Sequence, residues 1–328
     1  MKNHLPFTFR NNLTIDSVEY RELANIELQR LKEKGLNTKT IIRLETILDQ
    51  TQTTSDVFEI CSFMSPDGHG IYYNKWNVRS PKHVFIFLNG LESHAGWFDD
   101  LADSFVSENI RTYALDRRGS GLNSRHCGTF QNWIDDITEV TKIAKDENPR
   151  AKIHLVSICF GAKPATACAI QNPGQYDSLI YMSPGLKVKV APTPKEKLMI
   201  TADKFPRAYF NIRTPIKLDE MFTSNTKALY FLYKDKLRTH SPRASDFFQA
   251  MMLNLFISKN LEKMKTPSLA LLAGNDRIVN NHKTMDILNK FKQQPKIIEY
   301  PDSDHVIFFG KSKEEMQRDI LNFLISEI

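Results

Sequence analysis

The chain has 328 residues, a net charge of +6, and apolar, charged and aromatic fractions of 41%, 25% and 10%, which are typical of a globular protein with one large core. No stretch approaches the roughly 18 to 20 apolar residues of a membrane span, the polar N-terminus contains no signal-peptide core, and the four cysteines lack metal-ligand spacing. We therefore expect a cytoplasmic protein without a transmembrane segment or a metal site.

Residues 1–55 are expected to form a helical extension before the main domain. Asp16 with Glu19 is typical of a helix start, and an amphipathic run continues to Lys34. A second helix is predicted over residues 38–50. We interpret the two helices as a hairpin that braces the main domain rather than as an arm for a partner.

Residues 57–63 and 70–78 predict an antiparallel hairpin, because a Pro-Asp-Gly turn signal separates them. Beyond the hairpin, short apolar segments alternate with helical ones. Such alternation favours a mainly parallel sheet that is covered by helices on both faces. Six further strands are expected at residues 83–88, 111–115, 153–157, 178–182, 268–273 and 296–300.

Residues 186–262, which we call the insertion, interrupt this alternation and contain no matching strand. The insertion holds 14 Lys and Arg against 7 Asp and Glu, so the rest of the chain has a net charge of −1. All of the excess positive charge therefore lies in this one segment. A run of Phe and Met occupies residues 247–257.

Cys159 stands between the predicted strand at 153–157 and a helix of small residues. Ser157 and Gly161, two positions away on either side, are as small as a sharp turn requires. This strand-turn-helix context is that of a nucleophile elbow, which exposes its central side chain at the C-terminal edge of a parallel sheet. A free cysteine is more often a small buried hydrophobic residue, and the short motif alone does not decide between these readings.

Two further candidates follow later strands. Asp276 lies just after the strand at 268–273, and His305 lies just after the strand at 296–300. Because functional groups in open α/β sheets gather at the carboxyl ends of the strands, we expect both side chains to lie near Cys159. The chain order of nucleophile, acid and histidine is that of α/β-hydrolases.

From about Phe63 to its C-terminus, the chain resembles the monoacylglycerol-lipase and lysophospholipase group of α/β-hydrolases, of the serine aminopeptidase S33 type. The motifs that carry this resemblance are the Pro-Asp-Gly turn, residues 89–98 (NGLESHAGWF), residues 116–121 (DRRGSG), the elbow, and the loops of Asp276 and His305. The resemblance implies an α/β-hydrolase core at residues 56–185 and 263–328, with the insertion as its lid.

The chain departs from the family pattern at four positions. The family typically has His where this chain has Asn89, Gly in place of Glu92, Gly in place of Ser157, and Ser in place of Cys159. The change at the nucleophile matters most, because it replaces an alkoxide chemistry with that of a thiolate.

By the same resemblance, the backbone N–H groups of Leu91 and Phe160 form the oxyanion hole, and such main-chain donors survive side-chain changes. Glu92 lies beside this hole, where a carboxylate opposes a developing oxyanion unless it points away. His94 is expected to play at most a supporting role. The run at residues 247–257 either lines an acyl channel, for which Met is adaptable, or packs as an ordinary helix.

These observations predict an acyl-ester or thioester hydrolase with a small-molecule substrate. Cys159 attacks, His305 shuttles the proton, and Asp276 orients His305. The acyl thioester formed on Cys159 also reacts with amines, alcohols and thiols, so the alternative is an acyltransferase. A third alternative is a degenerate hydrolase that has lost its catalytic activity and serves as a binding module.

The positive charge of the insertion favours an acidic carrier protein, coenzyme A or an anionic lipid surface as a partner. Alternatively, these lysines and arginines are ordinary solvated surface residues. We expect no nucleic-acid partner. No cofactor is expected either, because the Gly-Ser-Gly at residues 119–121 lacks the third glycine of a dinucleotide fingerprint.

Overall fold

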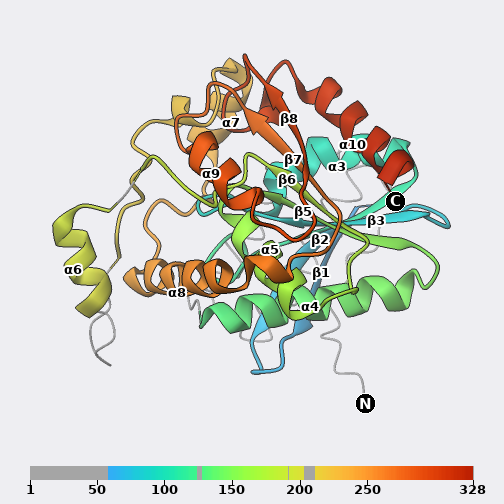
Figure 1. Cartoon of the computed structure of the whole chain (residues 1–328), viewed down its shortest axis with the longest axis horizontal. Helices are drawn as coiled ribbons and strands as arrows, with labels where there is room; N and C mark the ends of the chain where they lie inside the picture. The colour runs from blue at the N-terminus through green and yellow to red at the C-terminus, as the bar shows by residue number, and fades with distance from the viewer. Residues whose placement is uncertain (1–57, 124–127, 191, 203–210, 328) are drawn as a thin grey trace, which may run out of the picture.

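The computed structural model describes residues 58–123, 128–190, 192–202 and 211–327. The described part of the chain contains an eight-stranded sheet in the order β1-β2-β4-β3-β5-β6-β7-β8 (Figure 1). Its strands are β1 (Phe58–Met64), β2 (Gly70–Trp76), β3 (His83–Leu88), β4 (Ile110–Leu115), β5 (Lys152–Ile158), β6 (Ser178–Met182), β7 (Ser268–Ala273) and β8 (Lys296–Tyr300). The predicted N-terminal extension lies outside the described residues.

The strand predictions are confirmed. The predicted hairpin is formed by β1 and β2, which pair antiparallel, and β2 also pairs antiparallel with β4. From β4 through β8 all neighbouring strands run parallel. Six of the seven residues of the central strand β5 are buried, as expected for a strand covered on both faces.

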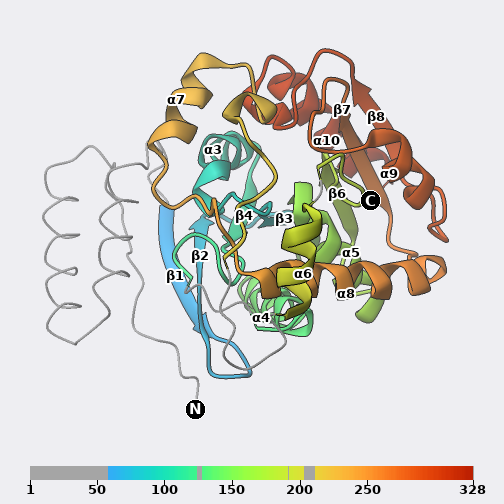
Figure 2. The ribbon, with the colours of Figure 1, turned by 90° about the vertical axis from the view of Figure 1, so that its left-hand side faces the viewer.

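Helices cover both faces of the sheet, as predicted. Figures 1 and 2 show α3 (Asp99–Ser107) and α10 (Lys313–Glu327) on one face, and α4 (Phe130–Glu147) and α5 (Ala162–Gln171) on the other. The helix α4 starts at a capping box formed by Thr129 and Asn132, which satisfies otherwise unpaired N–H groups. Every residue of α5 before its last is buried, because this helix lies between the sheet and a further helix, α8.

Between β6 and β7, the described part of the insertion adds helices and no strand to the sheet. These helices are α6 (Pro194–Ala202), α7 (Thr226–Lys234) and α8 (Ala244–Asn260), and α9 (Asn281–Leu288) follows β7. The long helix α8 packs against α5, α4 and α6, so this part of the insertion rests directly on the helix that follows the elbow. No helix among the described residues is long and apolar enough to cross a membrane.

Candidate active site

Cys159 occupies a sharp turn between β5 and α5. Its backbone φ is 52°, in the left-handed region, and the turn continues as a short 3-10 helix to Gly161. A side-chain-bearing residue held in that region stores strain on the order of 1–3 kcal/mol, and such strain clusters at functional sites. The predicted elbow geometry is therefore present at Cys159.

Two glycines allow the backbone to close around this strained turn. A Cβ on Gly161 would lie 2.4 Å from the carbonyl oxygen of Leu88, at the end of β3. Gly185, just after β6, donates its N–H to the Cys159 carbonyl at 2.8 Å, and a Cβ there would lie 2.8 Å from the Cys159 carbonyl carbon. The elbow therefore lies close against the ends of β3 and β6, the two strands that flank β5. Neither Gly161 nor Gly185 has room for a side chain.

His305 and Asp276 form a buried pair at the ends of β8 and β7. Nδ1 of His305 lies 2.7 Å from Oδ2 of Asp276, and both side chains are almost fully excluded from solvent. The other oxygen, Oδ1, accepts the backbone N–H groups of Ile278 at 2.8 Å and Val279 at 2.7 Å. These bonds fix the carboxylate, which in turn keeps a proton on Nδ1 of His305 and fixes the orientation of the ring.

The free nitrogen of this imidazole lies close to the elbow. Nε2 of His305 is buried and, within the described residues, has no hydrogen-bond partner at standard geometry. Burial lowers the pKa of His305, but the charges of Asp276 and then of Cys159 outweigh it and raise the pKa to about 10. An imidazolium at this place can stabilise a thiolate on Cys159. The structure therefore brings the three predicted residues together.

Cys159 opens onto a cavity of about 430 Å³ between the core and the insertion. That volume is in the range of small-molecule sites, which are usually lined by apolar groups with a few polar ones. The walls are contributed by Leu91, Phe160, Val188, Val190, Pro192, Ile200, Pro215, Ile216, Phe247, Ala250, Met251 and Ile278, with Lys163, Lys197, Asp246 and Asn254 as the polar members.

The helix α8 accounts for both readings of the run at residues 247–257. Phe247 and Met251 line the cavity, whereas Leu253 and Ile257 are buried in the core. One side of α8 therefore lines the cavity, and a neighbouring side holds the helix in place.

The two residues predicted for the oxyanion hole, Leu91 and Phe160, both line the cavity beside Cys159. Glu92 does not line it. Its buried carboxylate accepts bonds from Nε of Arg238 at 2.8 Å and from Thr214, so its charge is neutralised by the insertion. The conflict that the sequence suggested between Glu92 and a developing oxyanion is thereby removed.

His94 does not line the cavity and forms structural hydrogen bonds instead. Its Nε2 lies 3.1 Å from Oδ1 of Asp235, and its Nδ1 accepts the N–H of Gly96 at 3.1 Å. The same aspartate accepts the indole N–H of Trp97 at 2.8 Å. A neutral imidazole with its proton on Nε2 satisfies both contacts, so His94 joins the loop after β3 to the insertion.

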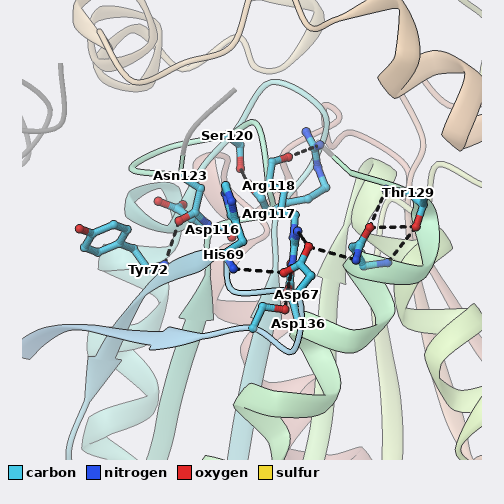
Figure 3. Close-up of polar contacts among 12 residues, drawn as sticks. Asp67, His69, Tyr72, Asp116, Arg117, Arg118, Ser120, Asn123, Thr129 and Asp136 are labelled. Carbon is cyan, nitrogen blue, oxygen red and sulfur yellow. Dashed lines mark hydrogen bonds and ion pairs between the residues drawn. The ribbon is translucent and has the colours of Figure 1, made fainter. Parts of the chain in front are cut away.

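The loop after β4 supports the loop that carries Leu91. Figure 3 shows Asp116, Arg117 and Ser120 in the loop that follows β4. Asn89, which replaces the family histidine, accepts the N–H of Arg117 at 3.0 Å and donates to Oγ of Ser120 at 3.1 Å. Through these bonds, residues of the 116–121 motif support the loop that follows β3.

Two polar residues of the site escaped the sequence analysis. Lys163 lines the cavity, and its position four residues after the nucleophile in a helix is the signal that points to it. Lys189 donates from Nζ to the carbonyl of Asp276 at 2.6 Å, and no local pattern predicts that contact. Among the described residues, no group of His, Cys, Asp and Glu side chains could hold a metal ion.

The fold is that of an α/β-hydrolase. A family model described as serine aminopeptidase, S33, matches residues 79–312, and the chain belongs to this family, as the sequence resemblance predicted.

Relatives and solved structures agree with this assignment. The chain is 20% identical over 275 residues to a monoacylglycerol lipase of Mycolicibacterium smegmatis, over 81% of this chain and 97% of that protein. It is 24% identical over 220 residues to a monoglyceride lipase homolog of monkeypox virus, over 65% of this chain and 78% of that protein. The structure of Paleococcus ferrophilus monoacylglycerol lipase is similar with a TM-score of 0.69 and 19% identity, over 79% of this chain and 99% of that one.

Proposed function

We propose that this protein is an acyl-ester or thioester hydrolase that works through Cys159, His305 and Asp276. The observation that carries the proposal is the buried His305–Asp276 pair. Its Nε2, which has no hydrogen-bond partner in the described part of the chain, lies beside a cysteine on a strained elbow turn. A nucleophile, a base and a group that orients the base are the components that acyl transfer requires. The relatives described as monoacylglycerol lipases support an ester of a lipid as the substrate class.

In the first half of the reaction, Sγ of Cys159 forms a bond to the substrate carbonyl carbon, and the carbonyl electrons move onto oxygen. The N–H groups of Leu91 and Phe160 are the proposed donors to that oxyanion. His305 then gives the proton on Nε2 to the leaving alcohol or thiol as its bond to the carbonyl carbon breaks. The product of this half is an acyl thioester on Cys159.

In the second half, Nε2 of His305 accepts a proton from water, and the water oxygen attacks the thioester carbonyl. The Cys159 thiolate leaves, and the imidazolium is restored beside it. Asp276 stays ionised throughout and stabilises the charged imidazole. We further propose that the insertion acts as the lid of this site, because α6 and α8 supply one wall of the cavity.

Mass spectrometry of the intact protein tests the nucleophile. After acid quenching of a reaction with butyryl N-acetylcysteamine thioester or with glycerol monobutyrate, we expect one butyryl group, located on the peptide that contains Cys159. Cys159→Ala should carry none, and the matched variant Cys168→Ala should still be acylated, because Cys168 is buried away from the cavity beneath Tyr176.

Product analysis separates hydrolysis from transfer. Butyrate as the product with water alone supports a hydrolase, whereas an acceptor-dependent product with an added amine or thiol identifies a transferase. Acylation of Cys159→Ala at the wild-type rate, or no acylation of the wild-type protein by either donor, would overturn the proposal.

A further inference from the structure

Lys163 places an ammonium group inside the cavity beside the nucleophile. It lies in the first turn of α5, four residues after Cys159, and lines the cavity with only 7% of its surface exposed. Nζ lies 5.7 Å from the centre of the Phe160 ring. Among the described residues, the ammonium forms no hydrogen bond and no ion pair with a carboxylate.

A buried ammonium without an anion is unfavourable for the fold, because burial penalises the charged form. At Lys163 burial lowers the pKa to about 8; the neighbouring Cys159 opposes that effect and Lys187 adds to it. A methionine of similar length would fill the same space without this penalty. The stability of the fold therefore does not explain the lysine.

Within the described cavity wall, no carboxylate is paired with Lys163. Among the lining residues of the described chain, Asp246 alone carries a carboxyl group, and its Oδ2 accepts the N–H of Arg243 at 2.9 Å. No ion pair joins Asp246 to Lys163. Within the described part of the chain, the anion available to Lys163 is therefore Cys159, and the other source is a bound molecule.

The nucleophile supplies such an anion for only part of the reaction. As a thiolate, Cys159 is already balanced by the imidazolium of His305. Once the acyl group is attached, the sulfur belongs to a neutral thioester, and Lys163 faces a cavity without a negative charge. An anionic group on the substrate is then the remaining partner.

The shared cavity of Lys163 and Cys159 limits where that group lies. The two residues stand four positions apart at the elbow and the start of α5 and line one cavity of about 430 Å³, so an anion bound by Lys163 occupies the same small cavity as the reacting carbonyl. The phosphates of a coenzyme A thioester lie at the far end of a long pantetheine arm and do not meet this condition. A carboxylate on the acyl group itself does.

Resting on the acyl chemistry proposed above for Cys159, we propose that Lys163 binds a carboxylate carried by the acyl group, so that the enzyme selects half-esters or half-thioesters of short dicarboxylic acids. The carboxylate is a strong acceptor for a buried ammonium, and the apolar walls hold the remaining methylene groups.

Two thioesters with the same four-carbon acyl length test the proposal: the N-acetylcysteamine thioesters of succinic acid and of butyric acid. We expect wild-type kcat/KM to be higher for the succinyl compound. In Lys163→Met, the ratio of succinyl to butyryl kcat/KM should fall at least tenfold, through loss on the succinyl compound only, and Lys163→Arg should retain part of the preference. Lys290→Met, which removes the same charge from an exposed site on the surface, should leave the ratio unchanged.

The Lys163→Met variant is also expected to fold, because the substitution removes a buried charge. Its melting temperature should equal or exceed that of the wild type.

Equal losses of kcat/KM on both thioesters would mean that Lys163 acts on Cys159 and not on the substrate, and would overturn the proposal. An unchanged ratio in Lys163→Met would overturn it as well. In either case, turnover of butyryl thioester by the wild type leaves the proposed function intact, whereas failure of both compounds to acylate Cys159 rejects both.

Discussion

Glu92 is bonded to Arg238 across 146 positions of the sequence, with Nε of Arg238 2.8 Å and Nη2 2.7 Å from the same carboxylate oxygen. Arg238 also reaches Asp219 at 2.6 Å and lies 4.9 Å from the centre of the Phe222 ring. Glu92 follows Leu91 directly, so the pair fastens the insertion to the loop proposed to stabilise the oxyanion. The glycine that is typical of the family at this position has no side chain with which to form such a link.

Removing one member of this pair should therefore be worse than removing both. Breaking a buried ion pair typically costs about 3–5 kcal/mol because it leaves a buried charge without a partner. We expect a loss of that size in the free energy of unfolding for Arg238→Met, and a smaller loss for the double variant Glu92→Leu, Arg238→Met. Urea denaturation of the single and double variants measures the difference, and strictly additive losses would argue against a coupled pair.

Gly161 should tolerate no side chain. In Gly161→Ala, the new methyl group would meet the Leu88 carbonyl at a distance that real side chains do not adopt, so the elbow must move and the Cys159 sulfur with it. We expect at least a tenfold loss of kcat/KM for butyryl thioester, since small displacements of reacting groups are costly to rate. Gly70→Ala is the matched control, because its nearest contact is an ordinary 3.9 Å approach to Met64. Wild-type activity in Gly161→Ala would contradict this account of the elbow.

The strand ends could be predicted from the sequence because the parallel strands are short segments rich in apolar residues, and all of them except the edge strand β8 are mostly buried. Those ends were sufficient to bring Asp276 and His305 together, since their positions follow directly from the sheet. The contact of Glu92 with Arg238 could not be predicted in this way. It depends on how the insertion folds back over the core, and no local pattern encodes that path.

The surroundings of Lys163 escaped prediction for a similar reason. A lysine in the first turn of a helix is ordinarily a solvated residue, whereas here α8 packs against the helix that carries Lys163. The reading of residues 247–257 stayed open because an apolar helix that lines a cavity and one that packs in a core have the same composition. Which side of α8 faces the cavity is a property of the assembled fold.

The His305–Asp276 pair should make stability depend on pH. The pKa of His305 is raised from an ordinary value of 6.5 to about 10, so its contribution is fully present below pH 6.5 and is lost as the pH rises toward 10. Asp276→Asn removes the charge that holds the proton. The stability difference between wild type and Asp276→Asn should therefore shrink between pH 6.5 and pH 9.5, by more than about 1 kcal/mol, the equivalent of roughly one pKa unit.

Urea denaturation of both proteins at several pH values measures this difference directly. Other groups that titrate in the same range, including Lys163, affect both proteins and cancel in the comparison. A difference that stays constant or grows with rising pH would mean that His305 is not held as an imidazolium by Asp276.

The basic charge of the insertion should attract anionic substrates over a distance. Exposed charges act over roughly 10 Å at 0.1 M salt and only about 3 Å at 1 M, so KM for an anionic coenzyme A thioester should rise with salt while KM for a neutral ester hardly changes. Reversal of the charge at the exposed residues Lys195, Lys217 and Lys236 should raise the KM for the coenzyme A thioester in the same way. Lys189 must be left intact, because its bond to the Asp276 carbonyl supports the site itself. Equal salt sensitivity of the two substrates would show that the charge of the insertion is ordinary solvated surface.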